Sequence, residues 1–469
     1  MSPIDYLIIT IGDLGLFHIA PELKRRGYFV AVISGSNQKE DIEFFQANNI
    51  PYWHINDLID KYRDEIYIKS DVIERIKEIY KIPSIRNFYY PYLFYHSGDF
   101  EYHDFYNLSN NSENDILFNR TLEIIQAIEC FFRDNHINFI VQNMGGEILR
   151  RTVYHCSKIK NIPNIIISWT PLSHHYTLLS NELGQWDEFV MKDYSQLSAE
   201  EIRQAKEYIM DFRSKGTNIT LRKTNKSNLN KIQMILDQYK ILRKRQDPFL
   251  ALKNTLVKGY YKATYSYKVS KLFREPDFDE NFFFFPLHYP AESRLTFWNA
   301  HCWRQEFIAE YVARSLPQGY KLYVKPHPEW VTAFPLEGLK MLSKVSNIQL
   351  IQPHIPSVQL IQNSVGVVVV NSTTGYEAIL YNIPVISFGT EFYNAYPLVL
   401  CVENFRDLPM LIYQALHQKP NNEAMLISFV NALLRASRPG NFGALEEKDI
   451  ILIVNGILDY SKKLIDDQF

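Results

Sequence analysis

Two short stretches of the chain carry side chains suited to binding phosphate. In the first, Lys325 and His327 alternate with two prolines, and each proline fixes its own φ and keeps the residue before it extended. The second, Asn371-Ser-Thr-Thr-Gly375, precedes a predicted helix whose N-terminal N–H groups and dipole favour an anion. Its hydroxyl groups belong to Ser372, Thr373 and Thr374. Taken separately, each stretch is also typical of an ordinary strand end or a well-capped helix.

Both stretches follow predicted strands. The apolar residues of Leu322–Lys325 and Val367–Val370 have the length and β-branching of buried parallel strands. After the second polar stretch, Tyr376–Tyr381 predicts a short helix and Ile383–Ile386 the next strand. Open α/β sheets bind ligands at the carboxyl ends of their strands, so we expect both stretches to lie at one edge of a sheet.

A third motif lies upstream, where Phe284-Phe-Pro-Leu-His-Tyr289 is followed by Glu292, four residues after His288. Together the three motifs resemble the nucleotide-binding half of the GT-B glycosyltransferases that build bacterial capsules and lipopolysaccharide. The likeness is greatest to the capsule polysaccharide biosynthesis family, which includes Kdo transferases. It extends from about Asn281 to Tyr393, and over roughly the first 240 residues it is only architectural.

The resemblance implies transfer of a sugar from a nucleotide donor, such as CMP-Kdo or a related CMP-sugar, to a glycan or lipid-linked acceptor. Lys325 and His327 would neutralise the departing phosphate, so no divalent metal or other cofactor is expected for that purpose. The residues Ser372, Thr373 and Thr374 would add hydroxyl and N–H donors. By the same likeness, Glu377 would accept hydrogen bonds from the ribose.

Glu292 is the candidate catalytic carboxylate. In the retaining Kdo transferases, a Gln is followed four residues later by an Asp that is the candidate nucleophile, whereas this chain has His288 and Glu292. A nucleophilic Glu292 would form a glycosyl–enzyme ester and give net retention. If Glu292 only orients the sugar, a base from the first domain, Asp13 or Glu147, would activate the acceptor for inversion. A surface carboxylate without a catalytic role is the third possibility.

The first half of the chain begins with a predicted β-α-β unit. Gly12 and Gly15 follow the strand Tyr6–Thr10, but the full GxGxxG pattern is absent, so NAD binding is not predicted. Asp13 could act as a base, although capping of the following helix is the preferred interpretation. Glu147 follows a glycine pair after another strand, and it could be a general acid or base or could stabilise a helix N-terminus.

Two further segments leave alternatives open. Between Lys240 and Arg274, ten lysines and arginines face one acid, Asp247, and tyrosines are interleaved with them. This segment suits either an anionic membrane surface or a solvated connector between domains. The aromatic stretch Phe88–Tyr95 could line a sugar-acceptor groove, but a core-facing segment is the preferred interpretation.

The amino-acid composition argues against several classes of protein. The formal net charge of −2 over 469 residues argues against a general nucleic-acid binder. Four widely spaced cysteines without a CxxC pair indicate a reducing compartment and no structural zinc site. We find no signal-peptide pattern, and no apolar run approaches the roughly 20 residues that span a bilayer. We therefore expect a cytoplasmic protein with optional peripheral attachment to the inner face of the cytoplasmic membrane.

We predict an α/β protein of the GT-B class, with two Rossmann-like domains facing a cleft and a C-terminal helix that returns to the first domain. The expected divisions are an acceptor-side domain at 1–238, a basic connector at 239–275, a nucleotide-sugar domain at 276–430 and a helical segment at 431–469. A CDP-polyol phosphotransferase of the teichoic-acid type is the alternative, but its later motif usually carries paired serines. A non-catalytic glycan-binding protein is the third hypothesis, and it would have little need for Lys325, His327 and Glu377 together.

Overall fold

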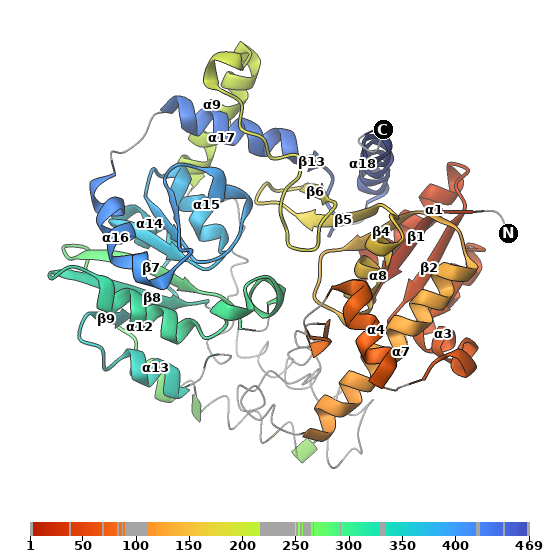
Figure 1. Cartoon of the computed structure of the whole chain (residues 1–469). Coiled ribbons are helices and arrows are strands. Elements are labelled where there is room, and N and C mark those ends of the chain that lie inside the picture. The colour runs from red at the N-terminus through yellow and green to blue at the C-terminus, as the bar shows by residue number, and fades with distance from the viewer. Residues whose placement is uncertain are drawn as a thin grey trace.

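The structure is a computed structural model, and it shows two α/β domains, each built on one sheet (Figure 1). The residues that it describes are 3–36, 39–67, 70–81, 84–86, 88–89, 111–215, 249, 252–253, 256, 264–265, 267–290, 292–327, 334, 336–418, 423–443 and 446–466.

The first sheet has seven strands in the order β13-β6-β5-β4-β1-β2-β3. Its strands are β1 (Ile4–Thr10), β2 (Val30–Ser34), β3 (Tyr52–His54), β4 (Ile137–Asn143), β5 (Asn164–Trp169), β6 (His175–Leu179) and β13 (Arg438–Pro439). The pairs among β1 to β5 are parallel, and β6 and β13 join in antiparallel fashion. Read from β3, the first six strands follow the order 3-2-1-4-5-6 of a doubly wound fold.

Helices cover both faces of this sheet. They are α1 (Leu14–Arg25), α2 (Lys39–Ala47), α3 (Ile55–Lys61), α4 (Ser70–Tyr80), α7 (Asn111–Asp134) and α8 (Ile148–Ile159). One buried cluster joins the sheet to α3, α7 and α8, and a second joins its other face to α1 and α2. The strands read as nearly continuous apolar runs because both faces are buried.

The second sheet is parallel throughout and has the order β12-β11-β10-β7-β8-β9. Its strands are β7 (Asn281–Leu287), β8 (Tyr320–Pro326), β9 (Ile348–Leu350), β10 (Gly366–Val369), β11 (Val385–Ser387) and β12 (Val399–Cys401). Its helices are α12 (Gln305–Ser315), α13 (Leu336–Leu342), α14 (Ser357–Asn363), α15 (Thr373–Leu380), α16 (Leu408–His417) and α17 (Glu423–Ala436). Counted from β7, the strand order is again 3-2-1-4-5-6.

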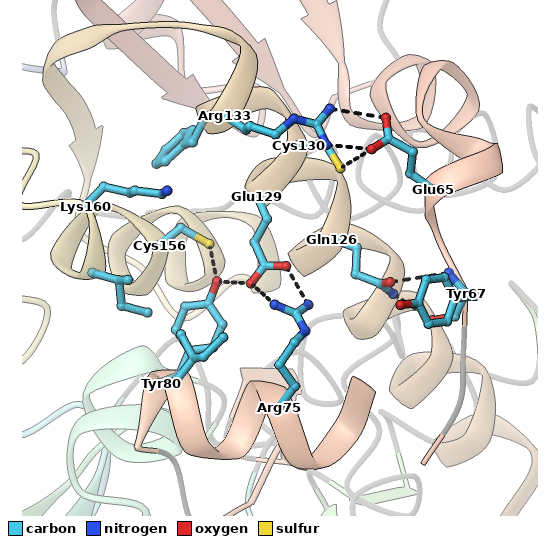
Figure 2. A pocket seen from close by; sticks show the side chains of 13 residues that line it. Glu65, Tyr67, Arg75, Tyr80, Gln126, Glu129, Cys130, Arg133, Cys156 and Lys160 are labelled. Atoms are coloured by element: carbon cyan, nitrogen blue, oxygen red, sulfur yellow. Dashed lines mark hydrogen bonds and ion pairs between the residues drawn. The ribbon is translucent and has the colours of Figure 1, made fainter. Parts of the chain in front are cut away.

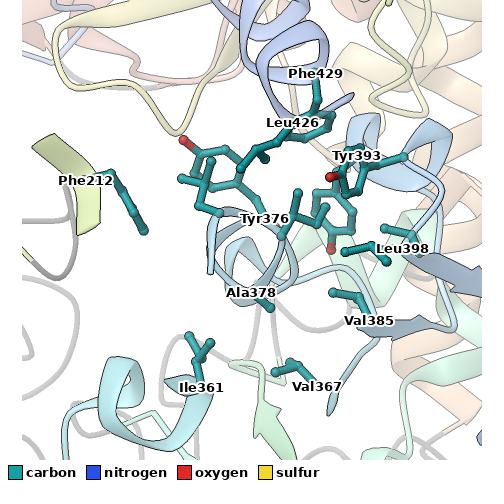
Figure 3. Packing of buried hydrophobic residues seen from close by; sticks show 14 of the residues in the cluster. Phe212, Ile361, Val367, Tyr376, Ala378, Val385, Tyr393, Leu398, Leu426 and Phe429 are labelled. Carbon is teal, nitrogen blue, oxygen red and sulfur yellow. The ribbon is translucent and has the colours of Figure 1, made fainter. Parts of the chain in front are cut away.

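Helix α9 (Ala199–Lys215) precedes this sheet in the chain but packs on its helices. Its Tyr208 hydroxyl hydrogen-bonds that of Tyr376 in α15, and Arg213 Nε donates to the carbonyl of Leu380 at 2.7 Å. Figure 3 shows Phe212 of α9 beside the apolar cluster that Tyr376 shares with Phe429 of α17. The domain boundary at residue 238 stays a prediction, but α9 packs against the second domain.

The closing helix α18 (Glu447–Asp466) returns to the first domain, as the sequence predicted. Tyr6 of β1 donates a hydrogen bond to Ser461 at 3.1 Å, and Ile453 and Ile457 are buried in the cluster that includes α1. Figure 1 shows α18 beside α1 and β5, far from the helices that precede it in the chain. The two doubly wound sheets, one mainly and one wholly parallel, and this returning helix confirm the predicted GT-B class.

The predicted basic and aromatic segments are described only in part. Most of 240–263 and all of 90–95 lie outside the described residues. At the end of the basic segment, Tyr265, Val269 and Phe273 are buried in the core of the second domain. Phe88 and Tyr89 are buried as well, as the core interpretation predicts for these two residues. Within the described part of the chain, no helix has the length and apolar character needed to cross a membrane.

Candidate functional site

Lys325 lies in the buried end of β8, where the Pro-flanked motif was predicted to present it. Its Nζ donates to Ser357 Oγ at 3.1 Å, at the start of α14, and the described residues include no carboxylate in direct contact with it. Burial lowers the pKa of Lys325 to about 8, although the charge of Glu377 raises it. Burial likewise raises the pKa of Glu377 to about 7, and Lys325 opposes that change. Lys325 and Glu377 are therefore close enough for their charges to interact, but they do not form an ion pair. The ammonium of Lys325 can thus bind an anionic ligand.

The polar stretch after β10 forms a capped helix start. Ser372 is the N-cap of α15, and its Oγ accepts from the Thr374 N–H at 3.2 Å and donates to Thr374 Oγ1 at 3.1 Å. Because the cap starts the helix at Thr373, α15 begins three residues before the predicted Tyr376. Tyr393 donates to the Ser372 carbonyl at 2.7 Å, and only glycine fits at 375, where a Cβ would lie 2.9 Å from the Tyr393 ring.

These contacts change what the hydroxyl groups can contribute. Ser372 and Thr374 satisfy each other within the cap, whereas Thr373 is half-buried at the first helical position. The helix N-terminus remains suited to an anion through its dipole and N–H groups. The assignment of Ser372, Thr373 and Thr374 to nucleotide binding stays a prediction.

His288 directly follows β7, and its backbone N–H, its carbonyl and its ring all make hydrogen bonds. Its N–H donates to Gln305 Oε1 at 2.7 Å, and its carbonyl accepts from Gln305 Nε2 at 3.0 Å. Its Nε2 accepts from the Asn371 N–H at 3.4 Å, so the neutral ring carries its proton on Nδ1. That Nδ1 lies 3.5 Å from Glu292 Oε2 and can donate to it. The ring thus links the ends of β7 and β10 to the candidate catalytic carboxylate.

Glu292 is 42% exposed at the side chain, and Arg294 Nε lies 3.7 Å from its Oε1. Burial alone would raise the pKa of Glu292. The hydrogen bond and charge of His288 and the charges of Arg294 and His327 outweigh that effect and hold the pKa below its usual value. At neutral pH this group is therefore a carboxylate, which can act as a nucleophile or base but not as a general acid.

Three residues of this region were missed from the sequence: Arg294, Asn371 and Glu391. Arg294 Nη1 lies 2.6 Å from Glu391 Oε1, and Glu391 is 3% exposed at the side chain. The carbonyl of Asn371 also accepts from Arg294 Nη1, at 3.3 Å. Glu391 follows β11 at the same sheet edge, so the strand-end rule could have identified it as a candidate.

In the first domain, Asp13 and Glu147 share one arginine. Arg150 is 5% exposed at the side chain, pairs with Asp13, and its Nη1 lies 3.0 Å from Glu147 Oε2. Asp13 and Glu147 occupy the N-cap positions of α1 and α8, but neither side chain makes a capping hydrogen bond. The preferred interpretation of Asp13 as a side-chain cap is therefore wrong, because its carboxylate pairs with Arg150 instead. A Cβ at Gly145 would meet the Glu147 carboxylate, so a larger residue there would displace this side chain.

The fold brings most of the predicted site residues to the carboxyl edge of the second sheet and places the other two in the first domain. Lys325, His327, His288, Glu292 and Glu377 gather at the carboxyl edge of the second sheet, together with the start of α15. Asp13 and Glu147 lie at the corresponding edge of the first sheet. The two edges approach each other where the guanidinium of Arg151 in α8 lies 4.0 Å from the ring centroid of Phe297.

A cavity of about 400 Å³ lies in the first domain, near the end of α8 opposite Glu147. Figure 2 shows that its charged side chains point toward one another: Arg75 contacts Glu129 at 2.8 Å, and Tyr80 donates to the same carboxylate at 2.8 Å. None of the predicted site residues lines this cavity. Both of its carboxylates, Glu129 and Glu65, are already paired with arginines, so we do not assign the reaction to it.

No three His, Cys, Asp or Glu side chains of the described residues come together as a possible metal site. The expectation that phosphate neutralisation needs no metal stays a prediction.

Residues 197–399 match the family model described as Capsule polysaccharide biosynthesis protein. This matched segment belongs to the capsule polysaccharide biosynthesis family. The capsule-family segment starts just before α9 and reaches β12, so it takes in α9 together with the sheet on whose helices α9 packs. It also contains Lys325, His288, Glu292 and the start of α15. No curated protein matches the chain significantly in sequence.

Solved structures with a similar arrangement include two from Thermosulfurimonas dismutans. Its KpsC beta Kdo 2,4 transferase is 11% identical, with a TM-score of 0.39, over 69% of this chain and 91% of that one. Its KpsC beta Kdo 2,7 transferase is 14% identical, with a TM-score of 0.34, over 70% and 89%. The UDP-GlcNAc 2-epimerase from Neisseria meningitidis is 12% identical, with a TM-score of 0.32, over 97% and 100%. Likenesses at this level do not extend to function.

Proposed function

We propose that the protein is a glycosyltransferase that moves a sugar from a nucleotide donor onto a bacterial capsule or lipopolysaccharide glycan. One observation carries this proposal: a buried, non-contacting Lys325–Glu377 pair shares a sheet edge with the half-exposed carboxylate of Glu292. This edge holds a cation for a phosphate and a carboxylate for a sugar. The family of residues 197–399 supports the assignment to capsule synthesis.

In this proposal Lys325 and His327 stabilise the departing phosphate. The glycosidic transition state is cation-like, and the leaving phosphate gains negative charge as its bond to the sugar breaks. Lys325 is preorganised because burial and Ser357 hold its ammonium at the strand end. The N-terminus of α15 adds its dipole and N–H groups, and Glu377 accepts hydrogen bonds from the ribose hydroxyls.

Glu292 is the carboxylate that we propose to react with the sugar. Its oxygen forms a bond to the anomeric carbon while the bond to the phosphate oxygen breaks, and the electron pair leaves with the nucleotide. The acceptor hydroxyl then attacks the same carbon, releases the Glu292 carboxylate and passes its proton to solvent water, with net retention. The pairing of Asp13 and Glu147 with Arg150 supports this route over inversion, since both carboxylates are already bound to a buried guanidinium instead of facing an acceptor hydroxyl.

The proposed donor is CMP-Kdo or a related CMP-sugar, because the motifs resemble those of the Kdo transferases. A thermal-shift screen against CMP, CDP, UDP and GDP tests this choice. We expect stabilisation by CMP alone, followed by transfer of the sugar from the CMP-linked donor to a glycan acceptor. A response to CDP with transfer of a phospho-polyol would replace the proposal by the phosphotransferase alternative, and no response to any nucleotide would reject it.

We also propose that the basic segment from Lys240 to Arg274 aids attachment to an anionic membrane surface. The excess of lysine and arginine and the interleaved tyrosines support this. Neutralising Lys240, Lys244, Lys253 and Lys258 should reduce sedimentation with anionic vesicles and leave activity on a soluble acceptor unchanged. If the parent protein does not bind such vesicles, the attachment proposal is wrong.

A further inference from the structure

Arg294 is placed between two carboxylates that differ in their surroundings. Its Nη1 makes a direct 2.6 Å contact with the buried Glu391, and its Nε lies 3.7 Å from the half-exposed Glu292. Its guanidinium also lies 5.4 Å from the ring centroid of Trp298. The side chain of Arg294 is 19% exposed, so its charge acts in a partly dry environment, where electrostatic effects are stronger than in water.

The backbone around Arg294 is fastened to the end of β10. Asn371 Nδ2 donates to the Arg294 carbonyl at 2.9 Å, and the Asn371 carbonyl accepts from Arg294 Nη1 at 3.3 Å. The N–H of the same Asn371 donates to His288. Asn371, at the end of β10, therefore holds both Arg294 and His288, the two groups that lie beside Glu292. A preorganised catalytic carboxylate needs neighbours that are held in fixed positions, and these hydrogen bonds hold them.

We propose that Arg294, anchored by Glu391, is a positioning residue that keeps the Glu292 carboxylate ionised and directed for its reaction with the sugar. This inference rests on the catalytic role proposed for Glu292. The charged and titratable groups that face Glu292 are His288, Arg294 and His327, and the charge of Glu391 also acts on it directly.

The proposal separates the charge of Arg294 from the anchoring by Glu391. In Arg294→Gln, Glu292 loses a cation, so the pKa of Glu292 rises and more of it is protonated at a given pH. In Glu391→Gln, the guanidinium keeps its charge and the amide can still accept a hydrogen bond. Glu292 should then be no more protonated than in the parent, although its positioning is weaker.

Carbodiimide labelling at pH 6, mapped by peptide mass spectrometry, reads out this protonation without any turnover. At a pH well above its pKa, a carboxyl group is labelled in proportion to the small fraction of it that is protonated. We expect labelling of Glu292 to rise several-fold in Arg294→Gln, to stay near the parent level in Arg294→Lys, and not to rise in Glu391→Gln. Glu337, an 81% exposed carboxylate in α13, is the internal control and should not change. No rise in Arg294→Gln, or equal rises in Arg294→Gln and Glu391→Gln, would overturn the proposal.

Turnover supplies the second readout. We expect Arg294→Gln and Glu391→Gln each to lower kcat with little change in KM, and the double variant to be no slower than Arg294→Gln, because both act through one guanidinium. Additive losses would overturn the anchoring role. If labelling changes as expected but kcat does not, the control of Glu292 ionisation stands and the catalytic role proposed for Glu292 fails.

Discussion

Each domain places an arginine between two carboxylates at the carboxyl edge of its sheet. Both sheets have the strand order 3-2-1-4-5-6, and their ligand crevice lies where the order reverses, between the first and fourth strands. In the first domain, Asp13 follows β1, Glu147 follows β4, and Arg150 joins them. In the second domain, Glu292 follows β7, which is equivalent to β1, whereas Glu391 follows β11, the fifth strand of the order, and Arg294 lies between these two carboxylates.

The two arrangements differ in how completely the charges are matched. Arg150 contacts both of its carboxylates directly and is almost fully buried. Arg294 contacts only Glu391 directly, and Glu292 stays half-exposed beside His288. Since both carboxylates of the first trio are directly paired with a buried guanidinium, this trio is suited to a structural role. In the second trio, one carboxylate is held ionised and remains accessible for chemistry.

The largest expected effect is that of Glu292→Gln. Loss of a nucleophile should lower kcat by about 10⁴-fold or more. Glu147→Gln, the matched change in the first domain, should lower it far less. Intact mass spectrometry of the parent with donor but no acceptor should detect one sugar attached at Glu292. Inverted product from an enzyme without such an adduct would rule out the nucleophile, and full activity in Glu292→Gln would exclude any catalytic role.

Lys325→Ala and His327→Ala come next, because they remove the proposed phosphate partners. Each should lower turnover by about 10²–10³-fold with little loss of folding. Lys321→Ala is the matched control, since this lysine is on the same strand but pairs with Glu280 away from the carboxyl end. Steady-state kinetics with the true donor measures all three variants. Near-normal activity in His327→Ala would show that the phosphate assignment of this residue is wrong.

Arg150→Ala should mainly affect stability. It leaves Asp13 and Glu147 facing each other without their shared cation, which should cost about 3 kcal/mol in the free energy of unfolding. Arg203→Ala, which breaks exposed pairs with Glu200 and Glu207, should cost far less, because water screens these charges. Urea denaturation of both variants gives the comparison. Equal losses would contradict the structural role assigned to the Arg150 trio.

The smallest effect is a pH dependence of nucleotide binding. Protonated Lys325 binds phosphate and ionised Glu377 accepts from ribose, and burial brings their pKa values to about 8 and about 7. Affinity should therefore fall above about pH 8, as Lys325 loses its proton, and below about pH 7, as Glu377 gains one, by at most about tenfold per pH unit. Calorimetric titration of Lys325→Arg should lack the upper limb and that of Glu377→Gln the lower. An unchanged profile in both would contradict the assignment.

The sequence by itself determined the elements and the motifs that they carry. The runs at Leu322–Lys325 and Val367–Val370 are apolar and β-branched enough to identify buried strands without any distant contact. Likewise, the prolines around His327 and the hydroxyl of Ser372 act within a few residues, so the strand end and the helix start were predictable. The strand bounds differed by one or two residues and the start of α15 by three, because the cap takes effect before the apolar pattern begins.

Which charges meet was decided by the tertiary structure alone. Arg294 and Glu391 are 97 positions apart, and Asp13 and Arg150 are 137 positions apart. They meet because the strand order puts β10 between β7 and β11, and β1 beside β4, so their carboxyl ends become neighbours. The packing of α9 on the second domain depends equally on distant partners, Tyr376 and Leu380. Local residue preferences act over one turn or one strand, whereas these pairings follow from the order in which the strands assemble.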